Sequence, residues 1–136
     1  SAIEDHPLSP RISMIEGSST EPVVFSQVAE FASTASKVLL CLDSNHTHTH
    51  VLRELEIYAP MVSVGSYCIV FDTLIEELSS EYLASTDRPW EPGNSPRSAI
   101  DAFLAGSGGE RFVVDHSVTN RLMVTSARGG YLKRVV

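Results

Sequence analysis

Two continuous apolar runs, residues 37–43 (KVLLCLD) and 65–72 (GSYCIVFD), constrain the fold of this chain more than any other feature. Apolar runs without polar alternation are typical of strands that are covered on both faces, as in parallel sheets. Each run ends in an aspartate, Asp43 in the first and Asp72 in the second. The two runs therefore predict buried neighbouring strands whose carboxyl ends carry acidic side chains.

Helical segments alternate with these strands. Residues 47–62 carry an apolar stripe at helical spacing, with Thr47 as the expected N-cap, and Pro22 suits the first turn of a helix over residues 21–35. The remaining predicted elements are a strand at residues 11–17, a helix at 95–108, and strands at 111–115 and 120–127. This order predicts an α/β fold with a parallel sheet, helices on both faces, and an antiparallel C-terminal hairpin at the sheet edge.

Length, charge and cysteine content restrict the class of protein. A chain of 136 residues fits a single domain, residues 1–136, with room for a core. The net charge of −7 argues against non-specific binding to nucleic acid or anionic membranes. No apolar stretch approaches the roughly 20 residues of a membrane span. Cys41 and Cys68 lie in the two apolar runs, so we expect free thiols in the core and a cytoplasmic, reducing location.

Polar clusters follow three of the predicted strands. They are Glu16-Gly17-Ser18-Ser19, Asp43-Ser44-Asn45-His46 and Asp72-Thr73. Ligands of open α/β sheets bind beyond the carboxyl ends of the strands, so we expect these clusters to share one site. Asp43 and Asp72 either cap the helices that follow them or hold a divalent cation such as Mg²⁺, which prefers carboxylate oxygens.

Three histidines, His46, His48 and His50, alternate along residues 46–50. On an extended chain, this spacing suits a transition metal. If a helix begins near Thr47, His48 and His50 diverge as solvated side chains, while His46 lies beside Asp43. In that case His46 suits the role of a general base.

Two further features are compatible with a ligand site. Ser18 and Ser19 lie between a predicted strand and a helix, where they either cap the helix or contact a nucleotide-like ligand; no GxGxxG motif accompanies them. The loop at residues 85–96 contains Trp90 and Glu91 among three prolines, and is either a stiff surface loop or a lid over substrate.

The segments RISMIEGSS, LCLDSNHTHTHVLRELEIYAPMVSVGSYCIVFDT and DRPWEPGNSP resemble the cephalosporin hydroxylase / rhamnosyl O-methyltransferase family over nearly the whole chain. The resemblance implies a Rossmann-like class I methyltransferase fold that uses S-adenosylmethionine, closest in layout to the Mg²⁺-dependent, catechol O-methyltransferase-like branch. Strands three to seven of that sheet would lie in this chain. The two strands that precede them, with the glycine-rich cofactor loop, would lie before Ser1, so we expect this chain alone to be inactive.

The resemblance also implies roles for individual residues. Asp43 and Asp72-Thr73 match the metal ligands, with Thr73 in place of an Asn, and His46 matches the catalytic Lys. The matches to the cofactor-binding residues are Gly17, Ser18, Ser19, Thr20, Asp43 and Ser44. With Trp90 and Glu91 near the substrate, the expected reaction is O-methylation of a small molecule or sugar.

Two other functions compete with this one. A metal-dependent hydroxylase would need two histidines and one carboxylate, typically on a β-barrel-like fold, which the β/α order disfavours. A degenerate methyltransferase fold without catalysis is suggested by Thr73 and by the lack of the cofactor loop. Since a partial sheet exposes an apolar edge at the RISMI strand, we also expect a homo-oligomer.

Overall fold

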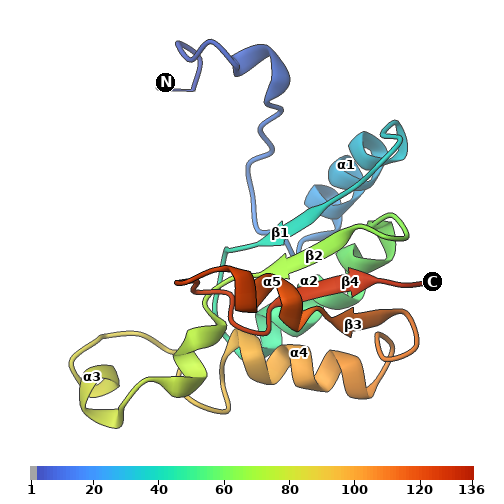
Figure 1. The fold of residues 1–136 in the computed structure, drawn as a ribbon. Helices are drawn as coiled ribbons and strands as arrows, with labels where there is room; N and C mark the ends of the chain where they lie inside the picture. Colours follow the sequence, from blue (N-terminus) through green and yellow to red (C-terminus); the bar gives the residue numbers. More distant parts are fainter. Residues whose placement is uncertain (1–2) are drawn as a thin grey trace.

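A four-stranded sheet forms the centre of the computed structural model, which describes residues 3–136 (Figure 1). The strands lie in the order β1-β2-β4-β3. The elements in chain order are η1 (Ser9–Arg11), α1 (Pro22–Ser33), β1 (Leu40–Leu42), α2 (His48–Tyr58), η2 (Ala59–Met61), β2 (Tyr67–Val70), η3 (Thr73–Glu77), α3 (Ser80–Ala84), α4 (Pro96–Ala105), β3 (Phe112–Val114), α5 (His116–Arg121) and β4 (Tyr131–Arg134). The predicted α/β class is confirmed.

The two apolar runs form the parallel pair that the sequence predicts. β1 and β2 pair in parallel, with Leu42 opposite Val70. β4 pairs antiparallel with β2 and also with β3. Because β1 and β2 run in the same direction, the residues that follow them emerge on the same side of the sheet, beyond the carboxyl ends of both strands.

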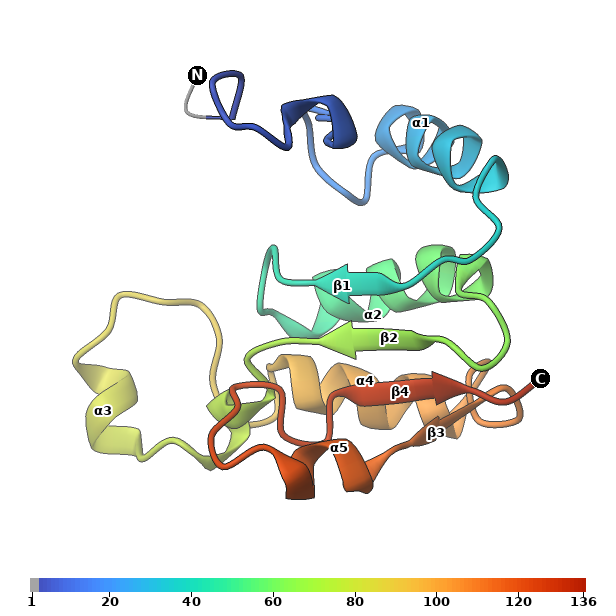
Figure 2. The same cartoon turned by 45° about the horizontal axis from the view of Figure 1, so that its top comes forward.

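One face of the sheet packs against α2 and α4, which lie behind the strands in Figure 2. The helices bury a continuous apolar stripe; Val51, Leu55 and Tyr58 of α2 confirm the predicted pattern. The core consists of Leu42, Val51, Leu55, Ala59, Val62, Cys68, Val70, Ala99, Ile100, Phe103, Phe112 and Leu132. Ser95 starts α4 with a capping box, since its side chain accepts from the Ser98 amide while the Ser98 hydroxyl receives the Ser95 N–H.

The opposite face of the sheet is only partly covered. Tyr67 lies on that face and donates a hydrogen bond to Asp115, the N-cap of α5. Cys41 is exposed, so the expectation that both cysteines belong to the core is confirmed for Cys68 and wrong for Cys41. Successive side chains of β1 point to opposite faces of the sheet, and the helices that form the core cover only one face. Cys41 is exposed because its side chain is on the other face.

The predicted strand at residues 11–17 is absent, which corrects one sequence expectation. Ser9–Arg11 form a 3-10 turn, and residues 12–16 belong to no helix or strand. Ile12 is 45% exposed and Met14 70% exposed. An extended segment becomes a strand only when a neighbour accepts and donates its backbone hydrogen bonds, and within residues 3–136 β1 pairs with β2 alone. The free edge of the sheet is therefore β1 instead of the RISMI segment.

The C-terminal hairpin also differs from the prediction. The antiparallel pairing of β3 exists, but its partner is β4 at Tyr131–Arg134, and residues 120–127 form no strand. Asp115 caps α5 by accepting from the amide of Ser117, so the chain turns into a helix directly after β3. Gly130 then lets β4 start close to β2, because a Cβ at that position would lie 2.1 Å from the Val70 carbonyl oxygen.

The long polar segment at residues 79–97 is more ordered than its composition suggests. It contains the short helix α3, which projects away from the sheet in both ribbon views (Figures 1 and 2). Ser79 caps α3 by accepting from the amide of Tyr82. In residues 3–136, every helix is too short or too polar to cross a bilayer.

Candidate functional site

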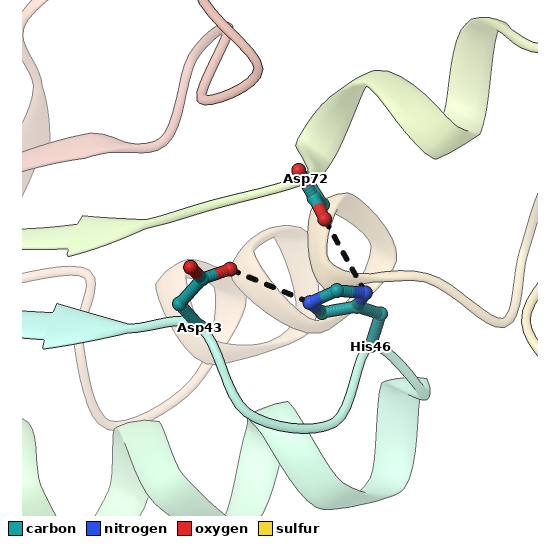
Figure 3. A group of neighbouring side chains, drawn as sticks. All are labelled: Asp43, His46 and Asp72. Carbon is teal, nitrogen blue, oxygen red and sulfur yellow. Dashed lines mark ion pairs between the residues drawn. The ribbon is translucent and has the colours of Figure 1, made fainter. Parts of the chain in front are cut away.

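Asp43, His46 and Asp72 converge at the carboxyl ends of β1 and β2 (Figure 3). Asp43 directly follows β1, Asp72 follows β2 by two residues, and His46 lies in the turn before α2. His46 Nε2 lies 3.5 Å from Asp43 Oδ1, and His46 Nδ1 lies 3.4 Å from Asp72 Oδ2. The parallel pairing of the strands brings together three residues that are up to 29 positions apart in sequence (72 − 43 = 29).

Asp72 has a backbone conformation that is rare for a residue with a side chain. Its φ is +53°, and it is the one non-glycine residue with positive φ in residues 3–136. Aspartate is among the few residue types that adopt this conformation at modest cost. Such conformations cluster at functional sites, where the surrounding structure holds them.

This group keeps unused capacity for a ligand. The ring nitrogen His46 Nε2 is buried and has no hydrogen-bond partner. The Asp43 side chain is 61% exposed and that of Asp72 is 39% exposed. One ligand atom from each of the three residues lies within 4.8 Å of the others, so two carboxylates and one imidazole can hold a divalent cation.

Thr73 lies next to this group in sequence but faces a different part of the molecule. Its side chain is buried, and its hydroxyl is within hydrogen-bond distance of the backbone carbonyls of Arg128 (2.8 Å) and Ser126 (3.2 Å). Thr73 thus attaches the end of β2 to the segment before β4. The structure brings His46, rather than Thr73, to the two carboxylates.

The three histidines of residues 46–50 diverge, as a helix start near Thr47 predicts. The expectation that His48 and His50 are solvated is wrong, because both rings are only partly exposed and contact serine hydroxyls. The His48 ring lies 2.8 Å from the Ser98 hydroxyl, which belongs to α4. His50 lies beside Ser19, at 3.0 Å from its hydroxyl. Thr47 occupies the N-cap position of α2, but its hydroxyl accepts no hydrogen bond from a helix amide and instead donates to Asn45 Oδ1.

Glu54 forms a second polar cluster, which sequence reasoning missed. Its carboxylate is 2% exposed, and its Oε1 accepts hydrogen bonds from the hydroxyls of Ser19 (2.5 Å) and Ser44 (2.7 Å). His50 Nε2 lies 3.5 Å from the same oxygen. The i, i+4 spacing of His50 and Glu54, in phase with Tyr58, was the available signal, since it places all three on one helix face.

The residues expected at the cofactor lie around two cavities. Gly17 and Ser19 line a cavity of about 240 Å³ together with Leu42 and Tyr58. Thr20 lines another, of about 310 Å³, beside His50. The Ser18 hydroxyl contacts that of Thr20 at 3.1 Å. Gly17 has a φ of +136°, and a Cβ there would lie 2.7 Å from Val24, so this turn requires glycine.

Trp90 lies beside the Asp43–His46–Asp72 group. Together with Asp72 and Tyr82, it lines a cavity of about 330 Å³, and its ring centroid is 6.5 Å from that of His46. Glu91 does not line this cavity; its backbone pairs with that of Asn94. The single tryptophan thus stands beside the acidic group, as the lid interpretation of the loop requires.

Comparison with known proteins agrees with these observations. Residues 1–135 match the family model for rhamnosyl O-methyltransferase/CmcI. The chain belongs to this family. The resemblance drawn from the sequence motifs is thereby confirmed.

Curated relatives come from mycobacteria. The rhamnosyl O-methyltransferase of Mycobacterium tuberculosis strain H37Rv is 30% identical over 128 residues, which are 92% of this chain and 48% of that protein. The rhamnosyl O-methyltransferase of Mycobacterium leprae is 28% identical over 130 residues, covering 92% of this chain and 51% of its own length. The chain therefore spans about half the length of these relatives. No solved structure matches it.

Proposed function

We propose that this chain forms the acceptor-activating part of an O-methyltransferase, which transfers a methyl group from S-adenosylmethionine to a hydroxyl of a small molecule or sugar. The observation that carries the proposal is the Asp43–His46–Asp72 group, which borders the aromatic-lined cavity beside Trp90. The names of the curated relatives support the same reaction class.

Asp43 and Asp72 would hold the divalent cation, for which we keep Mg²⁺ as the first choice. Their carboxylates provide the hard oxygen ligands that Mg²⁺ prefers, and His46 stays free to act on the acceptor. A bound cation would supply positive charge that lowers the pKa of an acceptor hydroxyl. Thr73 is no part of this set in our proposal, because its hydroxyl donates to backbone carbonyls.

His46 is the candidate base for the acceptor proton. Its Nε2 has no hydrogen-bond partner, so this nitrogen can accept a proton from a substrate hydroxyl. Asp72, near Nδ1, would orient the ring and stabilise the imidazolium that forms. The acceptor oxygen then bonds to the methyl carbon while the carbon–sulfur electron pair stays on sulfur.

Trp90 would provide one wall of the acceptor site. An aromatic face suits the apolar side of a sugar or another ring, and Leu74, Ile75 and Leu78 extend the apolar lining of the cavity. Glu91 acts only indirectly in this proposal, since its backbone pairing with Asn94 fixes the loop that carries Trp90. Orientation of the two substrates would provide much of the rate enhancement.

Two alternatives remain distinct from this proposal. A hydroxylase with two histidines and one carboxylate is disfavoured by the composition of the group, which has one histidine and two carboxylates. A non-catalytic member of the family would keep the fold without binding S-adenosylmethionine. The free edge of β1 keeps homo-oligomerisation as a prediction, and a cytoplasmic location is likewise still a prediction.

Calorimetric titration tests the proposed function. S-adenosylmethionine is titrated, with and without Mg²⁺ or Mn²⁺, into this chain and into a version extended at its N-terminus, and then into the Asp43→Ala variant of each. Asp101→Asn is the matched control, because Asp101 is an exposed aspartate paired with Arg97 on α4. We expect metal-enhanced binding by the extended form and by its control, and loss of this binding in Asp43→Ala. Absence of binding by both forms would favour the non-catalytic alternative.

A further inference from the structure

Three side chains of α2 converge on one serine of the loop before α1. His50, Glu54 and Tyr58 follow one another at intervals of four residues and therefore share one face of the helix. His50 Nε2 and Glu54 Oε1 both contact the Ser19 hydroxyl, at 3.0 and 2.5 Å. Tyr58 donates its phenolic hydrogen to the Ser19 carbonyl oxygen at 2.6 Å. Ser19 is thus held by both its side chain and its backbone.

The same carboxylate also holds the end of β1. Ser44 is two residues beyond β1 and donates its hydroxyl to Glu54 Oε1 at 2.7 Å. One oxygen atom of Glu54 therefore joins the loop before α1 to the turn after β1. These two segments are 25 residues apart (44 − 19 = 25).

Both serine hydroxyls donate to the same carboxylate oxygen, Glu54 Oε1. Each hydroxyl has a single proton, so both protons point at Glu54. The serine oxygens can still accept from His50 Nε2, which lies 3.0 Å from Ser19 Oγ and 3.3 Å from Ser44 Oγ. Burial and the charge of Glu54 raise the pKa of Tyr58, so its phenol stays protonated and donates. Neither serine keeps a proton to offer to a ligand.

We propose that Glu54 is a positioning residue of the methyl-donor site, an inference that rests on the proposed function. Ser19, which Glu54 holds, lines the cavity of about 240 Å³ together with Gly17 and Leu42. Ser19 presents lone pairs and backbone groups there. Such a surface is complementary to a ligand that brings hydrogen-bond donors, as the amino group and ribose hydroxyls of an adenosyl group do.

Burial of the Glu54 carboxylate costs free energy, which indicates that this side chain does more than fill the core. Glu54 Oε2 is buried and has no hydrogen-bond partner, which is an expensive state for a carboxylate oxygen. Buried ionic groups are commonly no more stabilising than apolar residues of similar size. A carboxylate that only stabilised the fold would therefore be easy to replace, whereas one that sets the spacing of Ser19 and Ser44 would not.

Titration of the N-terminally extended chain with S-adenosylmethionine separates these roles, and the wild type is that extended form. Glu54→Leu removes the acceptor at similar size, Glu54→Gln keeps one acceptor oxygen, and Glu56→Gln is the control from the exposed face of α2, where Glu56 pairs with Arg53. We expect Glu54→Leu to weaken binding about tenfold or more, since charge-assisted hydrogen bonds to both serines are lost. Glu54→Gln should recover most of the affinity, and Glu56→Gln should match the wild type.

Two outcomes overturn parts of the proposal separately. If the wild type binds and Glu54→Leu binds equally well, Glu54 is structural and the inference is wrong. If the wild type itself does not bind, the proposed function fails first, and the donor-site role falls with it. Should Glu54→Leu not fold, Ser19→Ala replaces it: the inference requires weaker donor binding with unchanged metal binding at Asp43 and Asp72, and unchanged donor binding contradicts it.

Discussion

The two polar clusters beyond β1 differ in the exposure of their carboxylates and in the hydrogen bonds that these carboxylates accept. In the Asp43–His46–Asp72 group, both carboxylates are partly exposed and the ring nitrogen His46 Nε2 has no hydrogen-bond partner. In the Glu54 cluster the carboxylate is 2% exposed; its Oε1 accepts from two serine hydroxyls, whereas its Oε2 has no hydrogen-bond partner. Both clusters combine acidic and histidine side chains, so composition alone does not separate them.

This difference teaches how a ligand site can be told from a structural cluster. Polar groups with free donor or acceptor capacity and access to a cavity are able to bind something. Groups whose protons are already committed to neighbours serve to hold segments in place. His46 and His50 illustrate the contrast, since they are four residues apart and have opposite roles in our proposal.

The largest effect is expected from removing the acidic side chains of the metal group. Asp43→Ala and Asp72→Ala should each weaken Mn²⁺ or Mg²⁺ binding by about a hundredfold, because each removes a charged oxygen ligand. Calorimetry with the metal alone measures this. Asp101→Asn should bind metal as the wild type does, and undiminished binding in Asp43→Ala would remove the metal site from the proposal.

Glu54→Ala should affect stability, in contrast to His46→Ala. The first leaves the hydroxyls of Ser19 and Ser44 without their acceptor and should lower the free energy of unfolding by about 1 kcal/mol. The second removes a ring that makes no hydrogen bond through Nε2 and should change it by less than about 0.5 kcal/mol. Urea denaturation compares the two variants, and equal losses would contradict the distinction between the clusters.

Thr73→Val tests whether Thr73 is a structural residue or a metal ligand. Since its hydroxyl donates to backbone carbonyls, its removal should cost about 1 kcal/mol of unfolding free energy and leave metal affinity unchanged. Calorimetry and urea denaturation on the same sample measure both quantities. A loss of metal affinity without loss of stability would restore Thr73 to the metal ligands.

The smallest effect concerns Asp115, which lies far from both clusters. Hydrogen bonds from Ser117 and Tyr67 lower the pKa of its carboxyl from 3.8 to about 2. Because the folded-state pKa is the lower one, its stabilising contribution is present above pH 3.8 and disappears as the pH falls through about 2. Asp115→Asn should therefore be less stable than the wild type near pH 6, with a difference that shrinks toward pH 2 in acid denaturation.

Local sequence signals predicted most of the elements that position the site. The apolar runs gave β1 and β2, the helical spacing gave α1, α2 and α4, and Pro22 lies in the first turn as expected. The sequence predicted that Asp43 and Asp72 lie close together, with His46 beside Asp43, because the carboxyl ends of neighbouring parallel strands lie on the same side of the sheet. The strand predicted at residues 120–127 failed because alternation of apolar residues is compatible with an exposed segment, and Met123 and Val124 are in fact 100% and 91% exposed.

The sequence by itself determined β1, β2, β3, α1, α2 and α4 and the polar residues that follow β1 and β2, because these depend on spacing and on neighbours along the chain. Only the tertiary structure decided which of those polar residues remain free. Ser19 meets Glu54 across 35 positions, and Thr73 meets Arg128 across 55. A hydroxyl has a single proton, and the partner that receives it is chosen by packing between segments that the sequence does not place side by side.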